Sequence, residues 1–168
     1  MSGAGKTTLA IALRDAIKPR LPQTVLIDGD IIRAAFGPSL GYSESERRTQ
    51  IDRIQKLAKI LDDQDQIVIV AALYAHPDLL NWNRQNFNSY FEVYLEASMD
   101  LLKRRDQKDL YSSAQSGDTE HVVGFDIPWN APTNPDAKFI ADQELTPHEM
   151  AVSLSHKIPS LDVIHQPA

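Results

Sequence analysis

The chain has 168 residues, of which 42% are hydrophobic, and its 17 lysines and arginines against 23 aspartates and glutamates leave a net charge of −6. This length predicts a single domain over residues 1–168, and the acidic balance argues against a nucleic-acid polymer as partner. The absence of cysteine excludes disulfides and thiolate metal sites, and no apolar run is long enough to span a membrane. We therefore expect a cytoplasmic protein with no membrane partner and no signal peptide.

The first ten residues, MSGAGKTTLA, contain most of a phosphate-binding loop of the type G-x-x-x-x-G-K-[ST]. Such a loop offers backbone N–H groups and a lysine to phosphate oxygens and a hydroxyl to Mg²⁺, at the start of a helix. The residues predicted to bind ATP in this way are Ser2, Gly3, Ala4, Gly5, Lys6, Thr7 and Thr8.

The first glycine of this motif would precede Met1, as would the buried strand from which such a loop normally extends. We expect Met1 to be an internal methionine and the full chain to start roughly 5–20 residues earlier. The preceding strand should be apolar, rich in β-branched residues and followed by glycine. A naturally shortened relative that binds nucleotide without turnover remains the alternative.

Apolar spacing and turn residues predict alternating helices and strands, which favours a parallel α/β sheet. In chain order we expect a helix over 9–17, a strand over 24–27, helices over 31–36 and about 44–61, strands over 67–73 and 91–97, a helix over 99–105, a strand over 139–141 and a helix from about 147 to 158. Capping boxes at Ser43 and Thr146 begin two of these helices. Residues 106–136, polar and proline-bearing, are expected to be irregular.

Two carboxylates, Asp28 and Asp30, follow the first expected strand. Carboxyl ends of parallel strands face the ligand crevice of an open sheet, so these groups are candidates for the site, although a simple polar turn is the alternative. We predict that Asp28 and Thr7 support Mg²⁺ and that Asp30 accepts a proton from the acceptor hydroxyl, with Lys6 as the third catalytic residue. Arg33, one helical turn beyond Asp30, could reach the same site.

The sequence resembles the adenylylsulfate kinase family, which transfers the γ-phosphate of ATP to the ribose 3′-hydroxyl of a sulfated nucleotide. The stretches that carry the resemblance are SGAGKTTLA at 2–10, IDGDIIR at 27–33, LGYSESERR at 40–48, RDQKDLY at 105–111 and GFDIPWNAPTNPD at 124–136. The resemblance implies a P-loop kinase fold, α/β, with a three-layer parallel sheet, flanking helices and a lid at about 105–136, here without its first central strand. It also implies a small nucleotide as substrate, and it leaves a homodimer open.

When the family's functional residues are aligned with this sequence position by position, the resemblance implies that Arg105 contacts ATP together with Lys6 and Thr7. The other aligned residues are implied to bind the acceptor. Arg33 and Arg47 would hold its phosphate-bearing end, and Tyr42 would stack on its base, where the family usually has phenylalanine. The predicted acceptor-binding residues are Arg33, Tyr42, Arg47, Gln50, Leu73, Arg84, Lys108 and Val122.

Departures from the family pattern gather on the acceptor side. Val122 stands where a second aromatic residue would complete the base sandwich, Gln50 replaces an asparagine, and Leu73 begins a stretch that lacks the family's serine and arginine. The acceptor is therefore either adenylylsulfate or another activated nucleotide, such as a cytidine diphosphate derivative used in surface-polysaccharide modification. A kinase of a sugar or shikimate-like alcohol would share the phosphate loop but not the later motifs.

Overall fold

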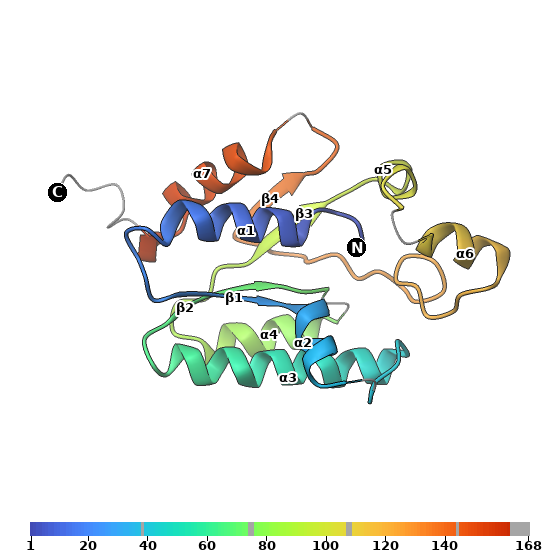
Figure 1. Ribbon diagram of the computed structural model, residues 1–168, viewed down its shortest axis with the longest axis horizontal. Coiled ribbons are helices and arrows are strands. Elements are labelled where there is room, and N and C mark those ends of the chain that lie inside the picture. The colour runs from blue at the N-terminus through green and yellow to red at the C-terminus, as the bar shows by residue number, and fades with distance from the viewer. Residues whose placement is uncertain (38, 74–75, 107–108, 144, 162–168) are drawn as a thin grey trace.

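The structure is a computed structural model, and it describes residues 1–37, 39–73, 76–106, 109–143 and 145–161. Helices and strands alternate along most of the chain (Figure 1). In chain order they are α1 (Lys6–Ile17), β1 (Thr24–Asp28), α2 (Gly29–Ala35), α3 (Glu44–Asp62), β2 (Ile67–Ala71), α4 (Pro77–Asn86), β3 (Val93–Glu96), α5 (Met99–Arg104), α6 (Leu110–Ser116), β4 (Ala137–Ile140) and α7 (Pro147–Lys157).

The strands pair in parallel, as predicted, but in two separate sheets of two strands each. Strand β1 pairs with β2 from Thr24 opposite Ile67 to Asp28 opposite Ala71. Strand β3 pairs with β4, beginning with Val93 opposite Ala137. No ladder joins β2 to β3 among the described residues. The parallel α/β class is thus confirmed, and the continuous sheet is interrupted between β2 and β3.

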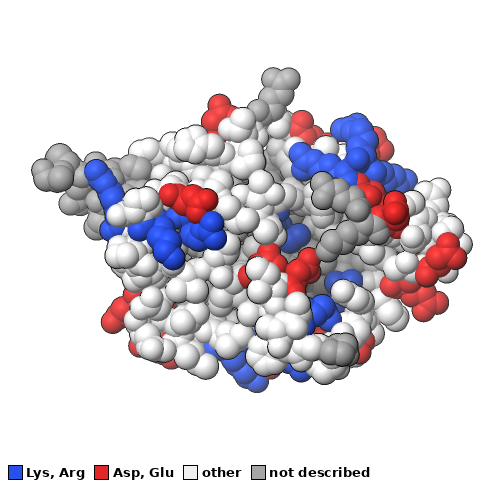
Figure 2. All heavy atoms as spheres, viewed as in Figure 1, with Lys and Arg blue, Asp and Glu red and all other residues white. Residues whose placement is uncertain are grey.

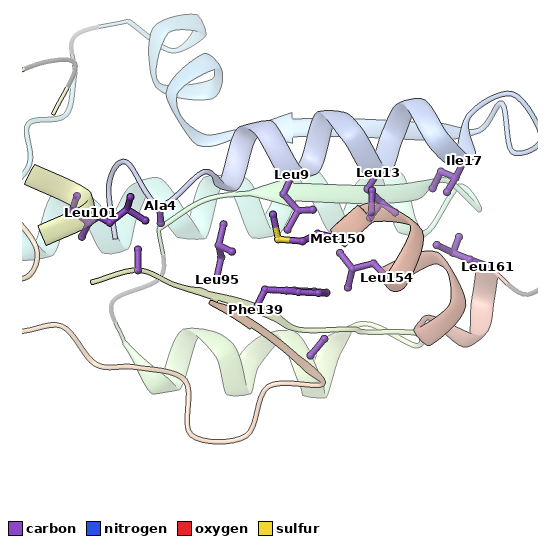
Figure 3. Packing of buried hydrophobic residues seen from close by; sticks show 14 of the residues in the cluster. Ala4, Leu9, Leu13, Ile17, Leu95, Leu101, Phe139, Met150, Leu154 and Leu161 are labelled. Carbon is purple, nitrogen blue, oxygen red and sulfur yellow. The ribbon is translucent and has the colours of Figure 1, made fainter. Parts of the chain in front are cut away.

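Helices cover both faces of the strands, and each face has its own apolar cluster. On one face, α1 and α7 pack together over β3 and β4, and Figure 3 shows their side chains pointing toward one another. On the other face, Ile27 of β1 packs with Ile51 and Ile54 of α3. Successive residues of β2 alternate between the two clusters, which explains why this strand is apolar throughout.

Helix ends follow the predicted capping chemistry. At the start of α7, the Glu149 N–H donates to Thr146 Oγ1 at 3.2 Å and the Thr146 N–H donates to the Glu149 carboxylate at 2.8 Å. At the start of α3, the Glu46 carboxylate accepts from the N–H groups of Ser43 and Gly41. Both predicted helix starts are confirmed, and Glu46 also fixes the turn just before α3.

Two helices were not expected from the sequence. Helix α4 begins with Pro77 as a first-turn proline, but it buries only Asn83, so it has no clear apolar stripe to detect. Helix α6 lies inside the stretch that was expected to be irregular. Its N-cap, Asp109, adopts a left-handed φ of 49° and offers no side-chain cap, which removes the usual start signal. Strand β2 ends at Ala71, two residues before the predicted end.

Charged side chains of both signs lie on the surface. Figure 2 shows lysines and arginines intermixed with acidic side chains on the viewed face. In the part of the chain that the structure describes, no helix has the length and apolarity needed to cross a membrane.

Candidate nucleotide site

The phosphate-loop residues form a tight turn at the N-terminus of α1. Gly3 and Gly5 have φ angles of 74° and 98°, a region that residues with a β-carbon rarely adopt, so glycine is required at both positions. Ala4 between them is buried against the core. The loop therefore directs the open backbone N–H groups of a twelve-residue helix to one place, which is the arrangement that binds phosphate oxygens.

Asp28 joins three parts of this site. It lies at the end of β1 and is buried, and its Oδ2 accepts a hydrogen bond from Thr7 Oγ1 at 2.6 Å. Its Oδ1 accepts from the N–H groups of Asp30 and Ile31 at 2.9 and 3.2 Å and so caps α2. One carboxylate thus holds the loop threonine and the first turn of α2 in fixed positions.

Lys6 lies next to both predicted carboxylates. Its Nζ donates to the carbonyl oxygen of Met1 at 2.7 Å. Burial lowers the pKa of Lys6, while the charges of Asp30 and Asp28 act in the opposite direction. The exposed Asp30 carboxylate thus interacts electrostatically with the Lys6 ammonium group. The structure brings the three predicted catalytic residues together at the carboxyl end of β1.

Two arginines contact the ring of Tyr42. The guanidinium carbon of Arg33 lies 4.5 Å from the Tyr42 ring centroid, and that of Arg47 lies 5.3 Å away. Arg33 also donates to the carbonyl oxygens of Leu40 and Gly41, and Arg47 to those of Tyr42 and His121. Burial, followed by the charge of Arg33, lowers the pKa of Arg47. Two guanidiniums at this spacing, beside a half-exposed ring, can bind an anionic nucleotide.

Helix α2 connects the two groups of residues. Asp30 lies in its first turn and Arg33 in its last turn, so one short helix sets the separation between the carboxylate and the arginine–tyrosine cluster. Gln50 of α3 supports the same helix, because its Nε2 donates to the Gly29 carbonyl at 3.2 Å. Gln50 is 4% exposed, and its Oε1 has no hydrogen-bond partner among the described residues.

The segment after α5 contacts the phosphate loop. Tyr111 donates from its hydroxyl to the Ser2 carbonyl at 3.1 Å, and Asp106 accepts from three consecutive N–H groups at the start of α6. A β-carbon at Gly5 would lie 3.8 Å from a guanidinium nitrogen of Arg105. Arg105 is therefore beside the loop, as expected. The contacts of Asp106 and Tyr111 give the RDQKDLY stretch a structural role as well, which the sequence alone did not predict.

Several predicted acceptor residues have other surroundings. Val122 is 2% exposed and packs in the apolar cluster that includes α1 and α7, so its side chain presents no open face here, and its contact with a base stays a prediction. Its apolar side chain is more stable in the core than in a polar slot. Phe125, three residues later, is 52% exposed and is an aromatic residue that the sequence reasoning missed. Lys108 lies outside the described residues.

Arg84 and Leu73 have further surroundings. Arg84 contacts the carboxylates of Glu92 and Asp136 at 3.3 and 3.2 Å, next to the amino-terminal ends of β3 and β4. Leu73 lines a cavity between β2 and β3, whose lining also includes Lys6. Contact of either residue with the acceptor stays a prediction.

Comparison with known proteins identifies relatives along nearly the whole chain. The family model described as adenylylsulphate kinase matches residues 1–139. An adenylyl-sulfate kinase of Picosynechococcus is 34% identical over 86% of this chain and 81% of its own length. A cytidine diphosphoramidate kinase of Campylobacter jejuni is 35% identical over 79% of this chain and 77% of its own length.

Among solved structures, the chain is similar to the Mycobacterium tuberculosis APS kinase CysC in complex with AMPPNP and APS. The TM-score is 0.84 at 26% identity, over 99% of this chain and 94% of that chain. The fold similarity therefore includes the loop, the strands and the helices described above.

Proposed function

The chain belongs to the adenylylsulphate kinase family, and on that premise we propose that it transfers the γ-phosphate of ATP to a hydroxyl group of an activated nucleotide. The observation that carries the proposal is the convergence of Thr7, Asp28, Lys6 and Asp30 at one end of β1, in front of the glycine turn. Phosphoryl transfer depends chiefly on such positioning and on charge stabilisation.

Mg²⁺ fits the donor set at Thr7 and Asp28. No cluster of three metal-ligating side chains exists among the described residues, so the protein by itself forms no metal cage. This agrees with a Mg²⁺ ion held largely by phosphate oxygens, with Thr7 as ligand and Asp28 orienting it. When bound, the ion neutralises charge on the phosphates of ATP.

In the proposed reaction the acceptor hydroxyl oxygen forms a bond to the γ-phosphorus, and the bond from that phosphorus to the bridging oxygen of ADP breaks. Asp30 accepts the hydroxyl proton, and Lys6 stabilises negative charge on the transferring group. Asp30 suits this role because it is exposed toward solvent, whereas Asp28 is buried and already accepts three hydrogen bonds.

The acceptor that we propose first is adenylylsulfate, the substrate implied by the family. Arg33 and Arg47 would bind its anionic end, and Tyr42 would stack on its base. A cytidine diphosphate derivative is the second candidate. It is favoured by the valine at position 122, which offers no second ring for a purine sandwich with Tyr42, and by the Campylobacter relative named above.

Radiolabelled ATP and a panel of acceptors test the proposal. Adenylylsulfate, cytidine diphosphate derivatives and a sugar alcohol are incubated with the full chain in the presence and absence of Mg²⁺. We expect labelled product from one nucleotide class, only with Mg²⁺. Transfer to the sugar alcohol alone would contradict the proposal, and ATP binding without transfer to any acceptor would identify a protein that binds nucleotide without turnover.

A further inference from the structure

A tight turn over residues 121–127 lies against the arginine–tyrosine cluster. The carbonyl oxygen of His121 accepts a hydrogen bond from Arg47 Nη2 at 2.7 Å, although the two residues are 74 positions apart in sequence. Gly124 packs on the Met1 side chain, since a β-carbon at Gly124 would lie only 2.7 Å from the Met1 sulfur. The 121–127 turn therefore contacts both an arginine of the proposed acceptor site and the start of the phosphate loop.

Asp126 forms hydrogen bonds that shape this turn. One of its carboxylate oxygens accepts from the His121 N–H and the other from the Val122 N–H. The Val122 carbonyl accepts from the N–H groups of Phe125 and Ile127, which closes the turn from the other side. Removal from water acts to raise the pKa of Asp126, but the two N–H groups outweigh it and hold the pKa below its ordinary value. Asp126 is therefore a charged acceptor for both donors at neutral pH.

The backbone of His121 depends on this support. Its φ is 67°, in the left-handed region that residues with a β-carbon seldom adopt. Without the Asp126 carboxylate, His121 would favour an ordinary negative φ, and this change would rotate its peptide groups. The carbonyl oxygen of His121 would then leave the Arg47 guanidinium. The position of that oxygen is therefore set by Asp126.

Arg47 is held by two backbone carbonyl groups. Its Nη2 donates to His121, and its Nε donates to the Tyr42 carbonyl at 2.8 Å. These bonds use two of the five N–H donors of the guanidinium and fix the orientation of its plane. Orientation matters at this position because an anion is bound best when two donors point at it in parallel. Burial and the charge of Arg33 lower the pKa of Arg47, whereas the charge of Asp126 acts against them.

We propose that Asp126 is a positioning residue for acceptor binding. It fixes the backbone of His121, and the His121 carbonyl orients Arg47 toward the anionic end of the acceptor. The inference rests on the proposed function, in which Arg47 binds that end. Asp126 acts through Arg47 and not on the reacting atoms, so its loss should weaken acceptor binding far more than ATP binding or kcat.

A double-mutant cycle tests the proposal. Asp126→Asn keeps the size of the side chain but leaves one oxygen for two N–H donors. Asp118→Asn is the matched control, because Asp118 is an exposed aspartate of the same segment that accepts from the Ser116 hydroxyl. Each change is made in the original chain and in Arg47→Gln, and the acceptor KM, the ATP KM and kcat are measured. Hydrogen exchange of the Arg47 Nε–H, followed by NMR without nucleotide, gives a readout that does not depend on kinase activity.

In the original chain we expect Asp126→Asn to raise the acceptor KM about 5- to 20-fold, to leave the ATP KM and kcat within about twofold, and to speed exchange of the Arg47 Nε–H. In Arg47→Gln the same change should alter the acceptor KM less than about twofold, because the effect passes through Arg47. Asp118→Asn should change none of these quantities.

An equal rise of the acceptor KM in both backgrounds, a parallel rise of the ATP KM, or unchanged exchange at Arg47 would overturn the proposal. The absence of turnover with every acceptor would contradict the proposed function instead. The exchange measurement would then still decide whether Asp126 positions Arg47, because faster exchange in Asp126→Asn supports that link and unchanged exchange removes it.

Discussion

At the scale of single residues, Asp28 shows why a motif position cannot be assigned one role. Its two oxygens cap α2 and hold Thr7 at the same time, so structural and functional demands meet in one carboxylate. Asp30, two residues later, is exposed. The two aspartates therefore differ in burial and in the hydrogen bonds they accept, and we expect their variants to behave differently.

The first prediction concerns Asp30. Asp30→Asn removes the proton acceptor and keeps the size of the side chain, so kcat should fall by ~10²-fold or more while ATP affinity stays within about twofold. Asp52→Asn, an exposed change on α3, is the matched control and should leave both unchanged. Steady-state kinetics and calorimetric titration of ATP provide the measurements. Near-normal turnover in Asp30→Asn would transfer the base role to another group.

The second prediction concerns Tyr42. Stacking of an aromatic ring contributes ~0.5–1.5 kcal/mol beyond burial, so Tyr42→Leu should raise the acceptor KM about 2- to 10-fold with little effect on the KM for ATP. Tyr42→Phe retains the ring and should behave like the original chain. The comparison is made with the acceptor identified in the panel. An unchanged acceptor KM in Tyr42→Leu would show that the base binds elsewhere, with the exposed Phe125 as the next residue to test.

At the scale of elements, α6 begins at a residue with an unfavourable backbone conformation, close to the phosphate loop. Asp109 has a φ of 49° in front of this helix. An aspartate tolerates this region better than most residues but still less well than glycine. The helix that presents Tyr111 to the phosphate loop thus begins from a strained residue, and Asp106 compensates by accepting its first N–H groups.

The third prediction follows from that strain. Asp109→Gly should raise the melting temperature by ~1–3 °C, and Asp109→Ala should lower it, because alanine adopts the left-handed region less readily than aspartate and much less readily than glycine. Asp65, with a φ of 58° between α3 and β2, provides a control away from the site. Asp65→Gly should give a similar gain. Equal melting temperatures for Asp109→Gly and Asp109→Ala would contradict the argument.

The elements also show which parts of the structure are encoded locally. The helix starts at Ser43 and Thr146, the strand before Asp28 and the glycine turn before α1 were predictable because capping, periodicity and positive φ depend on a few neighbouring residues. Helix α4 was not, because its burial is slight and comes from contacts with α3.

The positions of some site residues also follow from the local sequence, whereas those of others depend on long-range packing. Lys6, Thr7, Asp28 and Asp30 meet as expected because they belong to adjoining loop and strand ends. The inward turn of Val122 and the ion pairs of Arg84 with Glu92 and Asp136 depend on long-range packing. A resemblance aligns positions along the chain, but it carries no information on which way a replaced side chain turns.

At the scale of the whole molecule, the two sheets are separated by a cavity of about 370 Å³ lined by β2 and β3 and by helices on either side. Met1 and Lys6 are part of its lining, so the cavity adjoins the loop that would bind phosphate.

The last prediction concerns the buried Met1 amine and is tested by titration. The amine has a pKa of about 5 in the folded chain, against its ordinary value of 8.0, because burial removes it from water and, second, because the charge of Lys6 opposes protonation. Between these values the unfolded chain binds more protons than the folded chain, so the free energy of unfolding should rise with pH from 5 to 8 and level off above 8.

The full rise corresponds to up to about 4 kcal/mol, measured by urea unfolding of the chain with a free Met1 amine. Acetylation of the Met1 nitrogen removes the titrating amine, so the acetylated chain should lose that part of the pH dependence and retain the part due to other groups, such as Glu92, whose pKa burial raises. The difference between the two curves isolates the amine. Parallel curves would show that the Met1 nitrogen is solvated.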